Sequence, residues 1–433
     1  MAKLKMITFG CQANEADSEK IAGVLGKEGY ELTHSAAEAD LILINTCSIR
    51  EKAEQKVFSL LGRFQELKRQ RPGLRIGLCG CLAQREGERL KTRFPYLDIV
   101  VGPGAMIYEL PAILEGKTRG PEGLRPKAPL PLYVVSPRPR RESGFRAWVS
   151  IMEGCNYFCT FCIVPYTRGP ERSRPPEDIL TEVAELVATG YREITLLGQT
   201  VNAYGKNLRP RTTFAELLRQ IDALTQGGIR VRFTSSHPKD MRADLIEAMA
   251  ELPSVCEHLH LPVQSGSNRL LKRMRRLYGV EEYLEITQAL RTAIPGIALS
   301  TDIIVGFPGE GEADFEETME LLRTVRYDSI FAFKYSPRPL TPAERFDDQV
   351  PEAVKAERLK HLLALQETIS LERHQALVGA RVKVLIDQGP NRKEGSLCSG
   401  RTRTNAIVHF ARGQVPLGTE VVAQITDAYS YYL

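Results

Sequence analysis

Three cysteines within eight residues are the strongest chemical signal in this sequence. Cys155, Cys159 and Cys162 lie in the run EGCNYFCTFC, directly after a short apolar stretch. A loop of this length can wrap around one metal centre, and thiolate is the ligand of iron–sulfur clusters. Structural zinc is the main alternative, but such a site normally closes with four ligands, and no nearby Cys or His supplies a fourth. The loop therefore favours an iron–sulfur site that keeps one metal position open for chemistry.

A second set of cysteines recurs along the first ~110 residues. Cys11, Cys47 and Cys81 each follow a β-rich run and precede a stretch of helical periodicity. The runs are Leu4–Phe9, Leu41–Ile44 and Leu74–Leu78, and the helices are expected near Ser18–Gly26, Glu51–Arg69 and Arg85–Phe94. This alternation is typical of a parallel α/β sheet, which binds ligands at the carboxyl ends of its strands. We expect the three thiols just past the ends of neighbouring strands.

Two thiols compete for the third position, because the sequence there reads Leu78-Cys79-Gly80-Cys81. Cys79 belongs to the apolar run and is expected to pack as a small hydrophobic residue. We therefore assign the ligand role to Cys81. Cys256 and Cys398 are also interpreted as packing residues.

Length and composition limit the class of protein. With 433 residues, of which 43% are hydrophobic and 26% charged, the chain has room for two to four domains and is neither fibrous nor wholly disordered. The first residues, MAKLKMITFG, lack the apolar segment of a signal peptide, and no run of residues approaches the length of a membrane span. We expect a cytoplasmic protein without membrane contact, whose nine cysteines bind metal or pack and do not form disulfides.

Positive charge is concentrated in two segments. The net charge is only +5, but residues 117–146 hold eight Lys and Arg against two acidic residues, together with six prolines. Residues 380–433 hold seven basic and four acidic residues. This distribution suggests a polyanionic partner, although a solvated charged face explains it equally well.

The remaining chain predicts an incomplete barrel and a small β module. Six strands with intervening helices are expected at Ala147–Met152, Glu193–Leu197, Arg230–Thr234, His258–Leu261, Ala298–Val305 and Ser329–Lys334. A closed (β/α) barrel needs eight strands, so a partial, open barrel is predicted. One helix should run from Pro351 to Val378, and β-rich runs follow at Val382–Ile386, Ala406–Phe410 and Glu420–Ile425.

The spacing C-x₃-C-x₂-C, with an aromatic residue before the third cysteine, resembles the radical S-adenosylmethionine (SAM) enzymes. In that family three thiolates hold a [4Fe–4S] cluster, and its fourth iron chelates the methionine end of SAM. The resemblance implies that Cys155, Cys159 and Cys162 are the catalytic cluster ligands. It also implies that Phe161 lies beside the adenine of SAM.

The longer run from Cys155 to Arg174, CNYFCTFCIVPYTRGPERSR, is similar to the methylthiotransferase branch of this family. The contexts GCQAN, NTCSIRE and GCLAQ around Cys11, Cys47 and Cys81 are similar as well. The resemblance implies a second [4Fe–4S] cluster on these three cysteines. It also implies an α/β fold class with three domains and a linker, whose expected bounds are as follows: a flavodoxin-like domain (1–116), a basic linker (117–140), a radical SAM barrel (141–373), and an RNA-binding β-barrel similar to TRAM (374–433).

Within the branch, three segments look most like the enzymes that methylthiolate N6-isopentenyladenosine next to the tRNA anticodon: residues 45–53, 335–339 and 400–405. Relatives act on threonylcarbamoyladenosine in tRNA or on an aspartate of a ribosomal protein, and both targets stay open. A cobalamin-dependent radical methylase is a further alternative, although no D-x-H-x-x-G element occurs in residues 1–130. A non-catalytic RNA-binding protein with a cluster or zinc is the alternative from another class.

Polar residues after the predicted barrel strands could bind the cofactor, because active-site groups lie at the carboxyl ends of such strands. By resemblance, Gln199 and Asn202 would lie near the amino-acid end of SAM, and Gln264 near its ribose. Loop turns and helix caps are the competing interpretation. His237 is interpreted as structural, and Arg168 or Arg174 would meet a carboxylate or phosphate of the cofactor.

The expected partners follow from the resemblance and from the C-terminal residues. Cations and aromatic rings suit an RNA-binding module, which would hold the tRNA anticodon loop: Lys383, Arg392, Lys393, Arg401, Arg403, Tyr429, Tyr431 and Tyr432. Reductive cleavage of SAM implies a low-potential electron donor such as flavodoxin or ferredoxin. We expect a monomer.

Overall fold

The computed structural model describes residues 1–47, 51–116, 139–141, 143–389, 397–411 and 415–433. Contacts between residues group the chain into two units. Unit 1 comprises Met1–Ser143, Glu153–Asn156 and Ile163–Arg174, and unit 2 comprises Gly144–Met152, Tyr157–Cys162 and Pro175–Leu433. Most of the predicted basic linker, residues 117–138, lies outside the described residues. The domain bounds expected at residues 116, 140 and 373 stay predictions.

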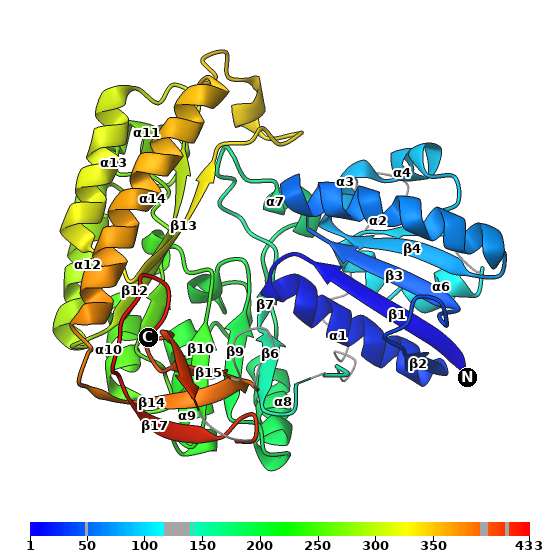
Figure 1. Ribbon diagram of the computed structural model, residues 1–433, viewed down its shortest axis with the longest axis horizontal. Coiled ribbons are helices and arrows are strands. Elements are labelled where there is room, and N and C mark those ends of the chain that lie inside the picture. The colour runs from blue at the N-terminus through cyan, green and yellow to red at the C-terminus, as the bar shows by residue number, and fades with distance from the viewer. Residues whose placement is uncertain (48–50, 117–138, 142, 390–396, 412–414) are drawn as a thin grey trace. The chain divides into compact units, whose positions relative to one another are not determined.

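Unit 1 is built on a five-stranded parallel sheet with the order β2-β1-β3-β4-β5 (Figure 1). Its strands are β1 (Ala2–Phe9), β2 (Tyr30–Leu32), β3 (Leu41–Thr46), β4 (Arg75–Gly80) and β5 (Ile99–Val101). This order is that of flavodoxin-like folds, so the predicted fold of the N-terminal region is confirmed. All residues of β3 are buried, because helices cover both faces of a parallel sheet.

Helices pack on the two faces of this sheet. One face is covered by α1 (Gln12–Lys27), α5 (Pro103–Met106) and α6 (Leu110–Leu114). The other is covered by α2 (Glu51–Gln70), α3 (Cys81–Glu86) and α4 (Arg89–Arg93). Two of these helices begin earlier than predicted: α1 directly after Cys11, and α3 at Cys81 itself. The turns between strand and helix are therefore shorter than the sequence pattern suggested.

Unit 2 contains the predicted six parallel strands of a partial barrel. They are β6 (Arg146–Ser150), β9 (Glu193–Leu197), β10 (Arg230–Phe233), β11 (His258–His260), β12 (Ala298–Val305) and β13 (Ser329–Lys334). They form two three-stranded sheets, β10-β9-β6 and β11-β12-β13. An isolated bridge from Val231 to Val255 lies between β10 and β11. The prediction of an open, six-stranded barrel is confirmed.

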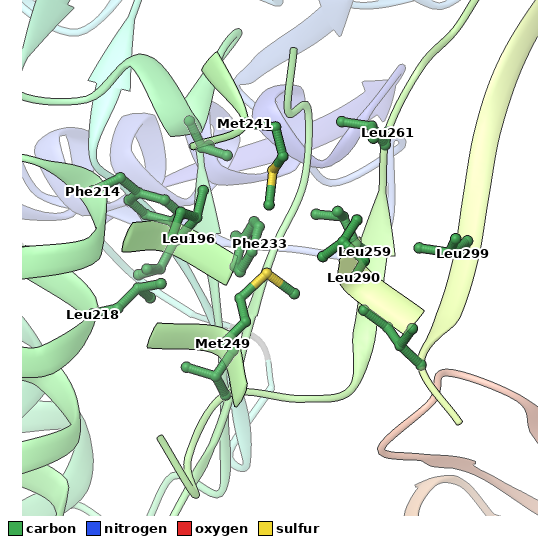
Figure 2. Packing of buried hydrophobic residues seen from close by; sticks show 14 of the residues in the cluster. Leu196, Phe214, Leu218, Phe233, Met241, Met249, Leu259, Leu261, Leu290 and Leu299 are labelled. Carbon is green, nitrogen blue, oxygen red and sulfur yellow. The ribbon is translucent and has the colours of Figure 1, made fainter. Parts of the chain in front are cut away.

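The barrel helices surround one large apolar core. The helices are α8 (Pro176–Ala188), α9 (Phe214–Thr225), α10 (Ala243–Glu251), α11 (Asn268–Arg273), α12 (Val280–Ala293) and α13 (Glu312–Val325). Figure 2 shows Phe233 of β10 between Met241 and, on α10, Met249, with Phe214 of α9 to one side. The rings of Phe214 and Phe233 meet edge to face, with centroids 5.0 Å apart. The remaining short elements divide between the units: β7 (Met152–Glu153) lies at their boundary, α7 (Val164–Arg168) and β8 (Arg172–Ser173) belong to unit 1, and unit 2 also contains η1 (Val201–Ala203), η2 (Pro238–Asp240) and η3 (Pro342–Arg345).

The predicted long helix is α14 (Glu352–Gln375), which packs against β13 and α13. Leu362 and Ile369 anchor it in the barrel core. The side-chain amide of Gln366 donates to the carbonyl oxygen of Tyr327 at 2.8 Å. In the part of the chain that the structure describes, neither this helix nor any other has the length and apolarity needed to cross a membrane.

The C-terminal residues form a four-stranded antiparallel sheet, in the order β16-β15-β14-β17. Its strands are β14 (Arg381–Gln388), β15 (Leu397–Thr402), β16 (Ile407–Ala411) and β17 (Glu420–Gln424). Strand β15 was not predicted, because its Ser and Gly residues were taken for a turn. A Cβ atom at Gly400 would lie 2.4 Å from the carbonyl oxygen of Leu385, so glycine is required by the close approach of β14.

Two buried arginines of β10 hold this sheet against the barrel within unit 2. The Arg230 guanidinium donates to the carbonyl oxygen of Arg401 at 2.7 Å, and that of Arg232 to the carbonyl oxygen of Thr402 at 2.6 Å. In the opposite direction, Arg403 of the C-terminal region forms an ion pair with Glu257 of the barrel at 2.8 Å. The C-terminal sheet is thus attached through buried charged groups, which would lose their partners if it moved away.

Replacing Phe233 by Ala should lower the free energy of unfolding by about 3–5 kcal/mol, because it leaves a cavity in the barrel core. Urea unfolding of the purified protein, followed by circular dichroism, measures the change. The matched control is Phe333→Ala, whose side chain on β13 is exposed. Similar losses for both variants would contradict the assignment of Phe233 to the core.

Candidate functional site

Cys11, Cys47 and Cys81 lie at the carboxyl ends of three adjacent strands. The register pairs Phe9 with Thr46, and Thr46 with Gly80, so β1, β3 and β4 end level with one another. The amide of Cys47 donates to the carbonyl oxygen of Phe9 at 3.0 Å. The order of the sheet reverses between β1 and β3, and this is where open α/β sheets bind ligands. The placement of the three cysteines agrees with the sequence prediction.

Two glycines allow the three strand ends to approach this closely. A Cβ atom at Gly10 would lie 2.9 Å from the Cβ of Cys47. Gly80 has φ of 92°, and a Cβ there would lie 2.4 Å from the side-chain oxygen of Asn45. A side chain at either position would push apart the residues that carry the thiols, so the glycine before Cys11 and the one before Cys81 are structural requirements.

A buried amide network lies beneath these thiols, and the sequence argument did not identify it. The side chains of Asn14 and Asn45 are fully buried, and Asn14 Nδ2 donates to Asn45 Oδ1 at 3.1 Å. Asn45 Nδ2 in turn donates to Ser18 Oγ at 3.0 Å. The Cys11 thiol donates to Asn14 Oδ1 at 3.3 Å. The network fixes α1 against β3 and so fixes the direction of the Cys11 side chain.

Cys79 and Cys81 have different surroundings. Cys79 is fully buried in an apolar cluster that includes Leu4 and Ile21, and burial raises its pKa to about 12. Burial also raises the pKa of the Cys81 thiol, but the charge of Arg168 opposes that rise. Thiolate is the form that binds metal, so these surroundings support Cys81 as the ligand. Cys256 and Cys398 are buried as well, in keeping with packing roles.

Arg168 is buried next to this set of cysteines within unit 1. Its guanidinium forms an ion pair with Asp17 at 2.8 Å, and the two side chains are only 8% and 4% exposed. Its charge also interacts with the thiols of Cys81 and Cys11. The sequence argument had assigned Arg168 or Arg174 to the cofactor. In the structure the partner of Arg168 is Asp17.

Backbone contacts anchor the loop that carries Cys155, Cys159 and Cys162, one part of which belongs to each unit. In unit 1, the amide of Cys155 donates to the carbonyl oxygen of Gly169 at 3.2 Å. In unit 2, Cys159 and Cys162 are joined by a tight turn, in which the Cys162 amide donates to the Cys159 carbonyl oxygen at 2.9 Å. Thr160, inside this turn, bonds through its hydroxyl to the carbonyl oxygen of Arg273 at 3.0 Å. The turn that carries two of the three thiols is therefore held on the end of α11.

A buried arginine also lies beside Cys159, and the sequence argument missed it. Arg276 Nη1 lies 3.5 Å from Cys159 Sγ, and its other nitrogens donate to the carbonyl oxygen of Pro262 and to the hydroxyl of Tyr278. In the sequence Arg276 is one of four basic residues between positions 272 and 276, which reads as a solvated charged segment. Only the fold shows that this one points into the protein.

The side chains predicted to bind the cofactor, those of Gln199, Asn202 and Gln264, differ in whether they already form hydrogen bonds within the protein. Asn202 is bound to the backbone of His237 through both atoms of its amide, each at 2.8 Å. Gln264 lies at φ of 77° in the loop after β11, where its backbone pairs with β12. The side-chain oxygen of Gln199, after β9, is buried without a hydrogen-bond partner. A buried acceptor of this kind fits a polar ligand such as SAM, because leaving it unsatisfied is costly.

His237 stacks on Tyr157 of the cysteine loop, with ring centroids 4.0 Å apart and planes nearly parallel. Burial lowers the pKa of His237 to about 2, so its ring is neutral at physiological pH. Its Nδ1 accepts from the amide of Lys239 at 3.2 Å. The Tyr157 hydroxyl donates to Asp240. The buried Nε2 of His237 has no hydrogen-bond partner among the described residues, so the structural role of this residue stays a prediction.

Phe161 belongs to a small apolar cluster with Phe307 of the loop after β12 and with Ile304. Its ring is therefore supported from the side of the barrel strands. Among the described residues, no three His, Cys, Asp or Glu side chains are gathered closely enough for a single metal ion. A four-iron cluster binds each thiolate through a different iron, so its ligands do not converge on one point.

Two family models match this chain. The Radical SAM superfamily matches residues 149–322, and a family described as Uncharacterized protein family UPF0004 matches residues 3–102. Curated relatives match over nearly the whole length. The tRNA-2-methylthio-N(6)-dimethylallyladenosine synthase of Carboxydothermus hydrogenoformans is 49% identical over 99% of this chain and 97% of its own. The enzyme of the same name from Moorella thermoacetica is 46% identical over the same shares.

Solved structures share the fold. The radical SAM methyltransferase TsrM of Kitasatospora setae, with cobalamin and a [4Fe–4S] cluster bound, has a TM-score of 0.60 at 14% identity, over 88% of this chain and 76% of that chain. The cobalamin-dependent radical enzyme OxsB has a TM-score of 0.56 at 16% identity, over 83% and 56%. At these identities the likeness concerns the fold alone, so it does not favour cobalamin chemistry here.

Replacing Cys81 by Ala should remove about half of the bound iron, because one of two clusters would lose a ligand. Cys79→Ala is the control and should keep the iron, since Cys79 packs in the apolar core. Iron analysis of anaerobically purified protein makes the comparison. The opposite result, with iron lost only from the Cys79 variant, would reverse the assignment.

Proposed function

This chain belongs to the family of tRNA-2-methylthio-N(6)-dimethylallyladenosine synthases and is a radical SAM tRNA methylthiotransferase, and we propose that it uses two [4Fe–4S] clusters to modify C2 of N6-isopentenyladenosine beside the anticodon. The observation that carries the proposal is the identity of nearly half of all residues along almost the full length of both chains. Likeness of this extent covers both cysteine-bearing regions, and not the radical domain alone.

Cys155, Cys159 and Cys162 are proposed to hold the cluster at which SAM is cleaved. The radical SAM family implies SAM and one such cluster. Three thiolates leave one iron without a protein ligand, which is the position that a substrate-binding cluster needs. The aromatic neighbours Tyr157 and Phe161 would limit the access of water.

Cys11, Cys47 and Cys81 are proposed to hold the second cluster. Their position at the switch point of the sheet supports this role, as do the two glycines and the buried amides that hold the strand ends together. Here too the open iron would be the place for chemistry. When held by these three cysteines, the cluster would supply a site for the sulfur that is methylated and then transferred.

When bound, the clusters and SAM supply a 5′-deoxyadenosyl radical, a methyl group and a site for sulfur. The cofactors are needed because an aromatic C–H has no acidity that a side-chain base could use near neutral pH. The side chains of this chain bind and orient. Gln199 is proposed to bind the amino-acid end of SAM through its buried oxygen, and Gln264 its ribose.

Asn202 is proposed to act indirectly on SAM. Both atoms of its amide are bound to His237, so it fixes the loop after β9 against the loop after β10. Phe161, supported by the apolar cluster around Phe307, is proposed to lie beside the adenine of SAM. These assignments extend the family-level function to individual side chains.

The C-terminal sheet is proposed to contact the tRNA. Tyr429, Tyr431 and Tyr432 are exposed aromatic residues, and Lys383 is largely exposed beside Glu420. Exposed rings and cations suit the stacking and phosphate contacts of a single-stranded loop. Arg403 is partly engaged with Glu257, so it contributes less to such a surface than its charge suggested. Arg392 and Lys393 lie outside the described residues.

Further partners follow from the proposed chemistry. Reductive cleavage of SAM consumes electrons, and flavodoxin or ferredoxin is the class of donor that supplies them at low potential. A tRNA substrate and thiols that must stay reduced favour a cytoplasmic location. We propose that the enzyme acts as a monomer.

A strain that lacks this chain should lose 2-methylthio-N6-isopentenyladenosine from its tRNA and accumulate N6-isopentenyladenosine. Mass spectrometry of digested tRNA measures both nucleosides. The wild-type chain should restore the methylthio product, and so should the packing variant Cys398→Ala, whereas Cys159→Ala should not. If the strain instead lost only the methylthio derivative of threonylcarbamoyladenosine, or only the modification of a ribosomal aspartate, that molecule would be the substrate.

Tyr431→Ala should weaken tRNA binding at least fivefold, because the stacking of a base on an aromatic ring contributes about 1–3 kcal/mol. Lys383→Ala should lower both the affinity and its dependence on salt. Lys360→Ala, an exposed residue of α14, is the matched control. Binding is measured by fluorescence anisotropy with the anticodon arm. Equal affinity for all variants would exclude this part of the sheet from the interface.

A further inference from the structure

The N-terminal cysteine site contains a buried ion pair that the proposed chemistry does not yet use. Asp17 lies on α1, the helix that follows Cys11, and Arg168 is the last residue of α7. Helix α7 packs against α3, whose first residue is Cys81. The ion pair therefore joins α1, which directly follows Cys11, to α7, which packs on the helix that begins at Cys81.

A cation at this place costs solvation energy and must have an electrostatic reason. The Arg168 side chain is only 8% exposed, and burying a charge is unfavourable unless it is compensated. Asp17 compensates it from one side. The thiols of Cys81 and Cys11 also interact with its charge.

Arg168 and Asp17 do not have equal electrostatic effects on the thiols of the cysteine site. The Arg168 guanidinium also forms a hydrogen bond with the Cys81 side chain. The positive member of the pair is therefore in contact with the cysteine site. Three thiolates exceed the positive charge of an oxidised [4Fe–4S] core, so the assembled site is anionic, and reduction adds a further negative charge. A cation on this side stabilises the more negative state.

We propose that Arg168, oriented by Asp17, is a positioning residue for the cluster on Cys11, Cys47 and Cys81, and that it raises the reduction potential of this cluster. Arg168 follows Cys162 by six residues, so the segment that leaves the radical loop supplies this charge to the other cysteine site. The inference rests on the proposed two-cluster function and names a residue that tunes it.

The test uses the full chain with Cys155, Cys159 and Cys162 replaced by Ala, so that only the N-terminal cluster is present. Its midpoint potential is measured by anaerobic redox titration, followed by electron paramagnetic resonance. Arg168→Gln should lower the equilibrium constant for reduction about tenfold, which is about 59 mV for a one-electron couple. Asp17→Asn should raise the potential, because it leaves the charge of Arg168 uncompensated.

Opposite shifts for the two variants separate an electrostatic role from a structural one. Arg85→Gln is the matched control, since Arg85 is equally buried in unit 1 but pairs with Glu54; its potential should not change. If Arg168→Gln prevents assembly of the cluster, retention of the cluster and of its potential in Arg168→Lys supports the role of charge. Loss in both variants would overturn it.

Two further results would also overturn the inference. One of them leaves the proposed two-cluster function intact, and the other refutes that function as well. An intact cluster with an unchanged potential in Arg168→Gln would refute the role of Arg168 and leave the two-cluster function standing. A triple Cys→Ala protein without any cluster would refute the two-cluster function itself.

Discussion

The proposed function places one electrostatic constraint on the structure: three cysteine side chains must be gathered as thiolates at each of two places, and Cys47, Cys81 and Cys159 among them are buried. Negative charges held close together in a medium of low dielectric constant repel one another and lose solvation. Each set of cysteines has a buried arginine beside it, Arg168 near Cys81 and Arg276 near Cys159. Both guanidinium groups are fixed by further acceptors, so they hold a positive charge in place and cannot turn toward solvent.

The two sets satisfy this constraint by different backbone geometry. Cys155, Cys159 and Cys162 lie within eight residues in the sequence, so a short loop is enough for all three to bind one cluster, and Thr160 anchors the turn that carries two of them. Cys11, Cys47 and Cys81 are more than thirty residues apart in sequence. Only a parallel sheet whose neighbouring strands end level can gather them, and this in turn requires glycine where the strand ends pack most closely.

Buried arginines also attach the C-terminal sheet to the barrel. Arg230 and Arg232 donate to backbone carbonyl oxygens of the segment from Arg401 to Arg403, and Arg403 pairs with Glu257. Part of the basic charge of this module is therefore used for attachment. The exposed rings and Lys383 remain for the proposed contact with an RNA loop, so the number of basic residues overstates the positive surface available to a polyanion.

The sequence by itself determined the order of the elements, the six barrel strands and the two sets of cysteines, because these follow from local periodicity and from residue spacing. It did not predict β15, because a glycine such as Gly400 is typical of a turn. The structure shows that glycine is needed there because the backbone of Leu385 on the neighbouring strand lies so close. The sequence also could not tell Arg276 from its solvated neighbours, or assign Asp17 to Arg168, which lies 151 residues away. Tertiary structure decided these points, since the partner of a buried charge is set by which chain segments pack together, and local sequence does not contain that information.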